Sequence, residues 1–568
     1  MSEGKINRRR ALLTFGLAGL APAVGGAGIA GIEGVHFAHG VASGDPLHDR
    51  LIIWTRLSGA DRATEVIWQV AEDEEFGRIV QTGRFITDQS RDYTVKVDVG
   101  GLVAGQVYFY RFESAGQTSP VGQAKTLPEN TDRLVLAVAS CSLHPNGYFN
   151  AYQAIAELKE VDAVVHLGDY IYEYGAGLND YGMANGQLLG RIPEPPHEIV
   201  SLQDYRQRHA QYKREPELQA AHGRAAWICV FDDHEICNNP WVGGAQNHNP
   251  EKGEGDYFTR KAAALKAHRE WMPIRDAEAG QLSETIYRRF RFGKLAELFM
   301  LETRLVARTE QLDYPDDIPF QVGEDDQKIP DYDALRVLIN APERELLGEA
   351  QRQWLDQGIE ASVAHEVTWQ VLGNQIIMAR VAGPDVRRIY GEPAVTGLLN
   401  RLPAKARAVV EPMVELFSQE PALPLNLDAW DGYPAERERL YDILKRHRAR
   451  TVVLSGDSHS AWANQLHDAA GTPVAVELGV TAISSPTVWF DALVPGFNLA
   501  QTLTDQNAEV LAASTAHNGF VRLTLTPQKA LGEWMSVSGI GSRDFRLFTE
   551  QAFEAQAEAD GIGPLKGV

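Results

Sequence analysis

Six short apolar runs in the second part of the chain limit its possible folds most strongly. They do not alternate between apolar and polar residues, which is typical of strands covered on both faces of a sheet. The runs are LVLAVASC (134–141), DAVVHLGD (162–169), AAWICVFDD (225–233), LAELFMLETR (295–304), TWQVLGNQ (368–375) and TVVLSGDSH (451–459). A helical stretch at 150–160 joins the first two runs, so a βαβ unit is expected there. The sequence therefore predicts an α/β domain of layered sheets and helices.

Helical patterns and insertions separate the later runs. Further helices are predicted at 202–221, 257–271, 342–355 and 435–446, the third with Pro342 in its first turn. The Gly-, Asn- and Pro-rich segment 175–196 and the acidic segment 313–333 are interpreted as surface insertions.

Polar side chains follow each of these predicted strands. They are Cys141, Asp169, Asp232 to His234, Glu302 and Arg304, Asn374, and Asp457 with His459. In an open α/β sheet the ligand site lies outside the carboxyl ends of the strands, so these groups are expected to converge. Gathering several carboxylates is unfavourable because like charges repel, but a multivalent cation reverses this balance. The sequence therefore predicts a metal site with thiolate, carboxylate and imidazole groups.

The segment before this domain has a different pattern. LIIWTRL (51–57), EVIWQVAED (65–73), YTVKVDVG (93–100) and QVYFYRFES (106–114) are predicted strands separated by turns, which is typical of a β-sandwich. Leu102 and Tyr108 resemble the tyrosine corner of fibronectin-like domains. We interpret this segment as a structural module, because it contains no cluster of catalytic residue types.

Composition and the N-terminus restrict the classes of function. The chain has 568 residues, too many for a single core, and a net charge of −22, which disfavours a nucleic-acid-binding surface. Arg8, Arg9 and Arg10 precede the uncharged stretch 11–32, and RRALL (9–13) resembles a twin-arginine export signal. An ordinary secretory signal or a lipid anchor is the alternative. No later stretch is long and apolar enough to span a bilayer. We therefore expect the twin-arginine export machinery as a partner and a periplasmic or secreted protein.

Several motifs together resemble the PhoD-type alkaline phosphatases. HGVASGDP (39–46) and IIWTRL (52–57) resemble the N-terminal module of that family, and ASCS (139–142), HLGDYIYEYG (166–175), FDDHEICNN (231–239) and LSGDSHS (454–460) resemble its metal motifs, in the same order. The resemblance implies a fibronectin/Ig-like β-sandwich followed by a calcineurin-like metallophosphatase domain, with two sheets sandwiched between helices. The expected boundaries are a signal peptide at 1–32, the sandwich at 36–128, the catalytic domain at 129–545 and a C-terminal tail at 546–568.

The resemblance also implies roles for the matching residues. Cys141, Asp169 and Tyr172 look like ligands of Fe3+, with Asp169 bridging to a neighbouring metal, which in this family is Ca2+. Asp457 and Asp233 look like further metal ligands, Asn238 is a candidate calcium ligand, and Asp232 is interpreted as a structural partner. His234 and His459 are the candidates for phosphate contact and proton transfer, with metal ligation as the alternative for each. Glu302 stands where the family is expected to carry Asp, so Glu302 is left out of the site.

The function implied is that of an exported alkaline phosphatase. It would hydrolyse small phosphate monoesters, with diesters as a further substrate class, by attack of metal-bound hydroxide, and would release inorganic phosphate. One alternative is a phosphodiesterase or phospholipase D-like enzyme of the same superfamily. The other is an exported surface- or polymer-binding protein in which the metal is structural.

Overall fold

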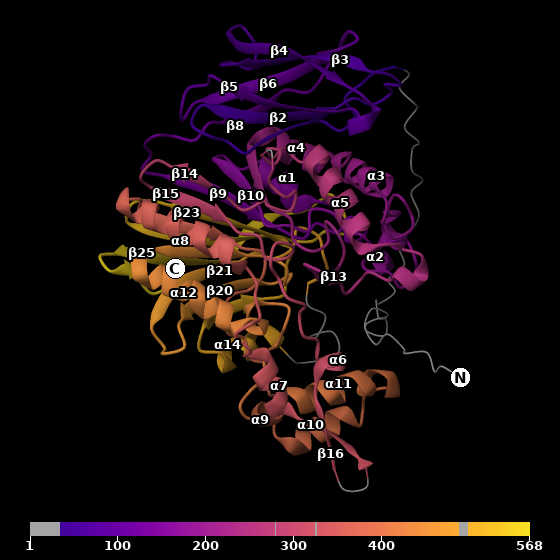
Figure 1. The fold of residues 1–568 in the computed structure, drawn as a ribbon, viewed down its shortest axis with the longest axis vertical. Helices are drawn as coiled ribbons and strands as arrows, with labels where there is room; N and C mark the ends of the chain where they lie inside the picture. The colour runs from indigo at the N-terminus through magenta and orange to yellow at the C-terminus, as the bar shows by residue number, and fades with distance from the viewer. Residues whose placement is uncertain (1–33, 279, 324–325, 488–497) are drawn as a thin grey trace.

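The computed structural model describes residues 34–278, 280–323, 326–487 and 498–568. The predicted signal segment 1–32 lies outside the described residues. Among the described helices, none has both the length and the apolar character that crossing a bilayer requires. Figure 1 shows three parts along the long axis: a β-module at one end, a central body of sheets and helices, and a smaller helical lobe at the other end.

Two stacked mixed sheets form the central body. In the larger sheet β9, β10 and β11 are parallel neighbours, and β23, β24 and β25 continue it on the β9 side. The smaller sheet has the order β14-β15-β18-β19-β21-β20-β22. The largest core cluster contains side chains from both sheets, so it joins the two sheets into one body. The bounds are β9 (Leu134–Ala139), β10 (Ala163–His166), β11 (Ala226–Cys229), β14 (Arg288–Phe292), β15 (Ala296–Met300), β18 (Trp369–Gly373), β19 (Thr451–Ser455), β20 (Ala461–His467), β21 (Pro473–Gly479), β22 (Val510–Ser514), β23 (Gly519–Leu525), β24 (Lys529–Val537) and β25 (Leu547–Glu558). All six predicted buried strands are thus present.

Helices cover the outer faces of this pair of sheets (Figure 1). Helices α1, α3, α4 and α5 pack on the side of the larger sheet, and α8, α12 and α14 pack on the side of the smaller one. Helix α1 joins β9 to β10, which confirms the expected βαβ unit. The bounds are α1 (Asn150–Ala156), α3 (Leu202–Lys213), α4 (Pro216–Arg224), α5 (Tyr257–Trp271), α8 (Gly348–Ala364), α12 (Pro434–His447) and α14 (Leu499–Gln506).

Three of the predicted helices differ from the observed ones. The helix predicted at 150–160 ends four residues earlier, at Ala156. The predicted helix 202–221 is broken into α3 and α4, because Pro216 cannot continue a helix and instead opens the second one. A capping box between Ser201 and Asp204 fixes the start of α3. The predicted helix 342–355 begins six residues later, at Gly348, so Pro342 lies in the preceding turn. The helices predicted at 257–271 and 435–446 are confirmed within one residue.

The N-terminal module consists of two packed sheets, one of which is shared with the central body. Strands β4, β3 and β6, with β7 and β8 beside β6, form the separate sheet, and β1, β2 and β5 extend the larger central sheet beyond β11. Between the two sheets lies a core of their own. The Val103 amide donates to the Tyr108 hydroxyl at 2.8 Å, as a tyrosine corner requires. The bounds are β1 (Val41–Gly44), β2 (Arg50–Arg56), β3 (Thr64–Ala71), β4 (Ile79–Thr87), β5 (Thr94–Gly100), β6 (Val107–Ser114), β7 (Gln117–Thr118) and β8 (Gly122–Lys125).

Residues 546–568 do not form the predicted tail. They contain β25, β26 (Gly561–Ile562) and β27 (Lys566–Gly567), and β25 pairs with β24 along most of its length. The buried ring of Phe553 packs against Trp534 with ring centroids 5.0 Å apart. The prediction was wrong because LFTEQAFEAQAE is rich in Glu, Gln and Ala, residues with low strand propensity, and only part of it alternates in burial. The sheet therefore extends almost to the last residue.

A helical lobe lies beyond the smaller sheet, at the lower end of Figure 1. It includes the predicted acidic insertion 313–333 and two small apolar cores of its own. The predicted insertion 175–196 carries one short helix, α2 (Met183–Leu189), and packs beside residues 144–146. The elements of the lobe are α6 (Tyr314–Asp317), β16 (Phe320–Val322), β17 (Lys328–Pro330), α7 (Tyr332–Ile339), α9 (Val386–Tyr390), α10 (Glu392–Leu399) and α11 (Ala404–Phe417).

Several buried histidines belong to β10, α3, α4 and α5, and they should make the fold sensitive to acid. Burial lowers the pKa of His166 and of His209 to about 3, and nearby cations act in the same direction. Neither ring nitrogen of His209 has a hydrogen-bond partner among the described residues. The unfolded chain binds a proton at each histidine below about pH 6.5 and the folded chain does not, so stability is full above that pH and falls below it.

We therefore expect the free energy of unfolding to fall as pH decreases from 6 to 4.5, with a slope of up to about 1.4 kcal/mol per pH unit for each buried histidine. His209→Phe should remove one such increment, whereas His197→Phe, at a mostly exposed side chain, should not. Urea unfolding at several pH values measures the slope. Equal slopes in the wild type and in His209→Phe would contradict this expectation.

Candidate metal and catalytic site

The ends of strands from both central sheets meet in one buried cluster. Cys141, Asp169 and Asp233 follow β9, β10 and β11 of the larger sheet, and Asp457 follows β19 of the smaller one. Three groups of their side chains could each hold a cation, because the ligand atoms within each group lie within 4.8 Å of one another. The groups are Cys141–Asp169–His459, Asp169–Asp233–His234 and Asp232–Asp233–Asp457. The structure thus brings together the thiol, carboxylate and imidazole side chains expected at these strand ends. Asn374 belongs to none of the three groups, because its side chain accepts from the Trp430 indole at 2.9 Å and donates to the Ile376 carbonyl oxygen.

The backbone at these strand ends is strained. Cys141, Asp169, Asp457 and His459 have φ values of 62°, 57°, 59° and 56°, in the left-handed region that residues other than glycine rarely adopt. Such conformations persist only where the surrounding structure enforces them, and they cluster at functional sites. Gly168 is required for a separate reason, because a Cβ atom there would lie 2.3 Å from the Asp232 nitrogen. The turns after β10 and β11 therefore pack in direct contact.

Glu235 holds these two turns together. Its carboxylate accepts the backbone N–H groups of Asp169 at 3.0 Å, Tyr170 at 2.6 Å and Asp232 at 2.8 Å. In the run Asp232-Asp233-His234-Glu235, the last residue thus satisfies backbone donors, and the others line the site.

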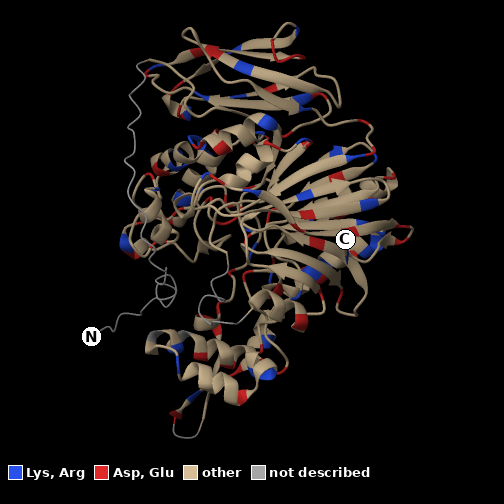
Figure 2. Ribbon diagram, turned by 180° about the vertical axis from the view of Figure 1, so that it is seen from behind, with Lys and Arg blue, Asp and Glu red and all other residues tan. Residues whose placement is uncertain are grey.

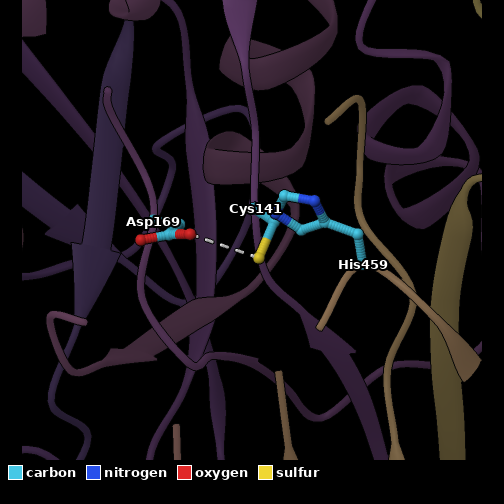
Figure 3. Close-up of side chains that lie close together, drawn as sticks. All are labelled: Cys141, Asp169 and His459. Carbon is cyan, nitrogen blue, oxygen red and sulfur yellow. Dashed lines mark hydrogen bonds between the residues drawn. The ribbon is translucent and has the colours of Figure 1, made fainter. Parts of the chain in front are cut away.

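The Cys141–Asp169–His459 group contains two of the three predicted iron ligands, and the third, Tyr172, contacts it. The Cys141 Sγ lies 3.4 Å from Asp169 Oδ2, and Figure 3 shows the His459 ring beside that thiol. The Tyr172 hydroxyl donates to Asp169 Oδ2 at 2.9 Å, accepts from Ser485 at 2.7 Å and lies 3.2 Å from His459 Nε2. Burial raises the pKa values of the Cys141 thiol and the Tyr172 phenol, and the charge of Asp169 raises both further. Without an added cation, both groups are therefore protonated.

The Asp232–Asp233–Asp457 group is short of positive charge. Burial raises the pKa of Asp457 to about 7, although the Arg304 guanidinium opposes this shift. Burial also raises the pKa of Asp232 well above its usual value. For Asp233 the burial effect is overcome by the charges of His234 and Arg304, so its pKa is lowered. The Asp232 Oδ2 and Asp233 Oδ1 atoms are buried and have no hydrogen-bond partner among the described residues.

These features fit bound cations. Two buried carboxylate oxygens without a hydrogen-bond partner are costly, and a cation could satisfy them. A cation would also favour ionisation of the neighbouring carboxylates, whose pKa values burial raises. The donor sets differ between the groups. The group with Cys141 offers a thiol and a nearby phenol, whereas the group with Asp457 offers carboxylate oxygens alone. The first set suits a redox-active transition metal and the second suits a hard cation such as Ca2+.

The two candidate catalytic histidines have opposite electrostatic environments. His234 Nδ1 donates to Glu173 Oε2 at 2.7 Å, and the His234 ring stacks on Tyr172 with centroids 4.2 Å apart. Burial would lower its pKa, but Asp233, Glu173 and Asp169 outweigh burial and raise the pKa well above 6.5. His459 is buried with less compensation, and the charge of His234 opposes its protonation, so its pKa is lowered to about 4. The site thus pairs an imidazolium with a neutral imidazole.

Asn238 lies next to the His234–Glu173 pair. Its backbone N–H donates to Glu173 Oε1 at 2.8 Å, and its side-chain amide donates to Gln246 at 3.0 Å. Its Oδ1 atom accepts from the Tyr174 hydroxyl at 3.4 Å. The role of Asn238 as a calcium ligand stays a prediction.

Arg304 and Asp428 complete the site, and sequence reasoning assigned a role to neither. The fully buried Arg304 guanidinium donates to Asp232 at 2.5 Å, Asp428 at 2.8 Å and Asp457 at 3.1 Å. Asp428 also pairs with Arg308 at 2.5 Å. The position of Arg304 at the end of β15 was a usable signal, but Asp428 lies in a loop without a recognisable pattern. The pairing with Arg304 supports the interpretation of Asp232 as a structural partner, while its second oxygen remains available.

Glu302 has a structural role, which agrees with leaving it out of the site. Its carboxylate accepts the backbone N–H groups of Arg304, Leu305 and Val306, each at 2.8 Å. These bonds shape the turn that directs Arg304 into the site. Glu302 in place of the expected Asp therefore affects how Arg304 is held. It does not change which side chains are candidate metal ligands.

Tyr181, from the insertion 175–196, covers His459. Its ring stacks on the His459 ring at an interplanar angle of 19°, and its hydroxyl lies 3.1 Å from His459 Nδ1. The Pro486 carbonyl oxygen is also 3.1 Å from the same nitrogen. Two groups thus fix the orientation of the imidazole, and one of them comes from a segment that the sequence indicated only as a surface loop.

Removal of the Tyr181 hydroxyl should therefore impair the site without unfolding it. In Tyr181→Phe the stacked ring remains but one hydrogen bond to His459 is lost, so we expect kcat for a phosphate ester to fall about 3- to 10-fold. KM should change less, because the predicted metal-ligating carboxylates are untouched. Tyr287→Phe, outside the site, is the matched control. Steady-state kinetics that do not differ between Tyr181→Phe and the wild type would refute this role.

Three comparisons relate the chain to known proteins. Residues 136–534 match the family model described as PhoD-like phosphatase, and residues 25–128 match the model described as its N-terminal domain. The chain is 33% identical over 548 residues to alkaline phosphatase D of Bacillus subtilis strain 168, covering 93% of this chain and 82% of that protein. It also matches a solved structure of PhoD with a TM-score of 0.75 and 30% identity, covering 94% of this chain and 92% of that one.

Proposed function

Because the chain belongs to the PhoD-like phosphatase family, we propose that it is a metal-dependent phosphoesterase that hydrolyses phosphate monoesters and also accepts diesters. One observation carries this proposal most directly. Thiol, carboxylate and imidazole groups from four separate strand ends form three groups, each with its ligand atoms within 4.8 Å of one another, and two of the buried carboxylate oxygens lack a hydrogen-bond partner among the described residues. This cluster of buried side chains is unfavourable without bound cations. With cations bound, it would be suited to an anionic ester.

Specific residues would hold the metals. Cys141, Asp169 and Tyr172 would hold Fe3+, and Asp169, Asp233 and Asp457, with Asn238, would hold Ca2+. When bound, the cations supply the positive charge that offsets the negative charge of a phosphate ester and lowers the pKa of water. Their local charge would also overcome the net charge of −22 of the chain, which alone would repel the substrate.

The protein side chains would orient the substrate and hold protons. The His234 imidazolium, held by Glu173, would donate to a phosphate oxygen. His459, neutral and fixed by Tyr181 and Pro486, is the candidate to assist the leaving oxygen. Arg304 would keep Asp232 and Asp457 in place and balance their charge.

The finer fold and location remain part of this proposal. Two facing sheets flanked by helices support a calcineurin-like catalytic domain, and the two packed N-terminal sheets with the Tyr108 contact support a fibronectin/Ig-like module. The RRALL motif supports export by the twin-arginine machinery and a periplasmic or secreted location.

A substrate panel tests the proposed activity. Turnover is measured on 4-nitrophenyl phosphate, on bis(4-nitrophenyl) phosphate and on a phospholipid, with the same metal-loaded preparation. The proposal expects hydrolysis of the monoester and measurable hydrolysis of the diester. Activity on the phospholipid alone would replace it with the phospholipase D-like alternative, and no turnover on any ester would favour a binding protein with structural metals.

A further inference from the structure

A second pocket lies far from the metal and catalytic site. It has a volume of about 320 Å³ and is formed where β6 and β8 of the N-terminal module meet the amino-terminal ends of β9 and β10 and the end of α4 (Figure 1). The site groups lie beyond the carboxyl ends of the same strands, about 20 Å away along β9. No residue of those groups lines the pocket.

Cations predominate in this pocket although the chain as a whole is acidic. Lys125, Arg133, Lys159 and Arg224 line it together with only two acidic residues, Glu160 and Asp162. Lys125 donates to Asp162 at 2.7 Å, and Arg133 pairs with Glu160. Both acidic groups are therefore neutralised, and the charges of Lys159 and Arg224 remain uncompensated. Elsewhere acidic and basic side chains are interspersed along the ribbon (Figure 2), and the net charge is −22.

Arg224 is held in position without a carboxylate partner. It is the last residue of α4, and its Nη2 donates to the carbonyl oxygens of Leu158 at 3.2 Å and Lys159 at 3.3 Å. Within the described part of the chain, neither Arg224 nor Lys159 forms an ion pair, and the Lys159 ammonium and the Gln123 amide make no side-chain hydrogen bond. One donor is thus held in position and the other two have no acceptor. Such hydrogen-bond donors around one pocket are suited to binding an oxyanion.

Apart from Gln123, the rest of the lining is apolar. Val107 and Val161, which are partly exposed, contribute aliphatic surface beside the cations, whereas Val135 and Ala225 are almost fully buried. The volume is at the lower end of the range for small-molecule sites, about 300–1,000 Å³. The pocket therefore combines a cationic end with a small apolar wall, which is suited to a compact amphipathic anion.

We propose that this pocket binds a small organic oxyanion of the phosphate and phosphonate class. The anionic head would contact Arg224, Lys159 and the Gln123 amide, and a compact apolar group would lie on the valines. This site is independent of the proposed catalytic function, because it shares no residue with the metal groups.

Phenylphosphonate is a suitable probe, because its C–P bond is not a phosphate ester and it carries both an anionic head and an apolar ring. Isothermal titration of the metal-loaded protein should show two binding events, one at the metal site and one at the pocket. The double variant Lys159→Gln/Arg224→Gln should lose one event, or weaken it about tenfold or more, since two charge-assisted contacts are removed. The double variant Lys294→Gln/Arg448→Gln removes the same charge at exposed pairs elsewhere and should keep both events.

Inhibition of ester hydrolysis by phenylphosphonate should be unchanged in both double variants, which shows that the metal site is intact. If the Arg224 change impairs folding, Lys159→Gln alone is used, because the Lys159 ammonium forms no hydrogen bond or ion pair within the described part of the chain, and weaker binding is again expected. Benzoate, with the same ring and a single charge, should bind the pocket more weakly. A single binding event in the wild type, identical isotherms in the pocket variant and the control, or equal affinity for benzoate would overturn the proposal.

Discussion

Asp169→Asn is expected to reduce hydrolysis of 4-nitrophenyl phosphate by about 10³-fold or more, measured as kcat on protein prepared with metals. Asp169 belongs to two of the three candidate cation groups, and its Oδ2 atom lies within reach of both the Cys141 thiol and the Tyr172 hydroxyl. An amide in its place keeps the shape but removes the charge that would bridge two cations. Asp333→Asn, at a largely exposed side chain, should retain normal turnover.

The stability of the same variant separates a catalytic effect from a folding effect. Burial raises the pKa of Asp169 well above its usual range, and the neighbouring carboxylates Asp233 and Asp232 raise it further, against the charge of His234. Loss of this carboxylate should therefore leave the metal-free protein at least as stable as the metal-free wild type. Near-normal turnover in Asp169→Asn would refute the site, and a large loss of metal-free stability would show that the carboxylate is structural.

Arg304→Met should lower the free energy of unfolding by about 3–5 kcal/mol at pH 7.5, the range for removing one partner of a buried ion pair. Arg304 is fully buried and donates to Asp232, Asp428 and Asp457. Without it, these carboxylates keep their burial cost and lose their main counter-charge. Denaturant unfolding measures the difference, and Arg448→Met, at an exposed pair with Asp560, should change it by less than about 1 kcal/mol.

The difference in unfolding free energy between the wild type and Arg304→Met should also depend on pH, which provides a second measurement. The pKa of Asp457 is raised to about 7 by burial even with Arg304 present, and it should rise further in Arg304→Met. In the variant, the carboxylates that have lost Arg304 then become neutral as pH falls through this range. The difference in unfolding free energy between the wild type and the variant should therefore shrink towards pH 5.5. If Arg304→Met lowers the free energy of unfolding by less than about 1 kcal/mol at pH 7.5, then bound cations, and not Arg304, balance the charge of the cluster.

The sequence predicted the core of the site because its residues occupy strand ends. Cys141, Asp169, Asp233 and Asp457 each follow an apolar run, and the geometry of parallel strands places such ends together. The strand-end position also indicated that Arg304 lies near the site, although it did not indicate what Arg304 does there. These residues were accessible because local pattern determines where a strand ends, and topology then determines where that end lies.

Other parts of the molecule depend on contacts that no local pattern records. Tyr181 reaches His459 from a Gly-rich insertion, and Asp428 reaches Arg304 from a loop, so each depends on how distant segments pack. The parallel pairing of β1 with β11, which joins the N-terminal module to the central sheet, involves segments about 180 residues apart. Strand β25 was missed because its Glu, Gln and Ala residues take their strand conformation from pairing with β24 and not from propensity.

The central claim is that residues from separate strand ends form a site for cations that act on a phosphate ester. Metal analysis of the protein purified without added metal, combined with its visible spectrum and its turnover before and after chelation, tests this claim most directly. We expect bound iron and calcium, a visible band that Cys141→Ser and Tyr172→Phe each alter, and hydrolysis that chelation abolishes and added metal restores. A colourless, metal-free preparation with full activity would contradict it.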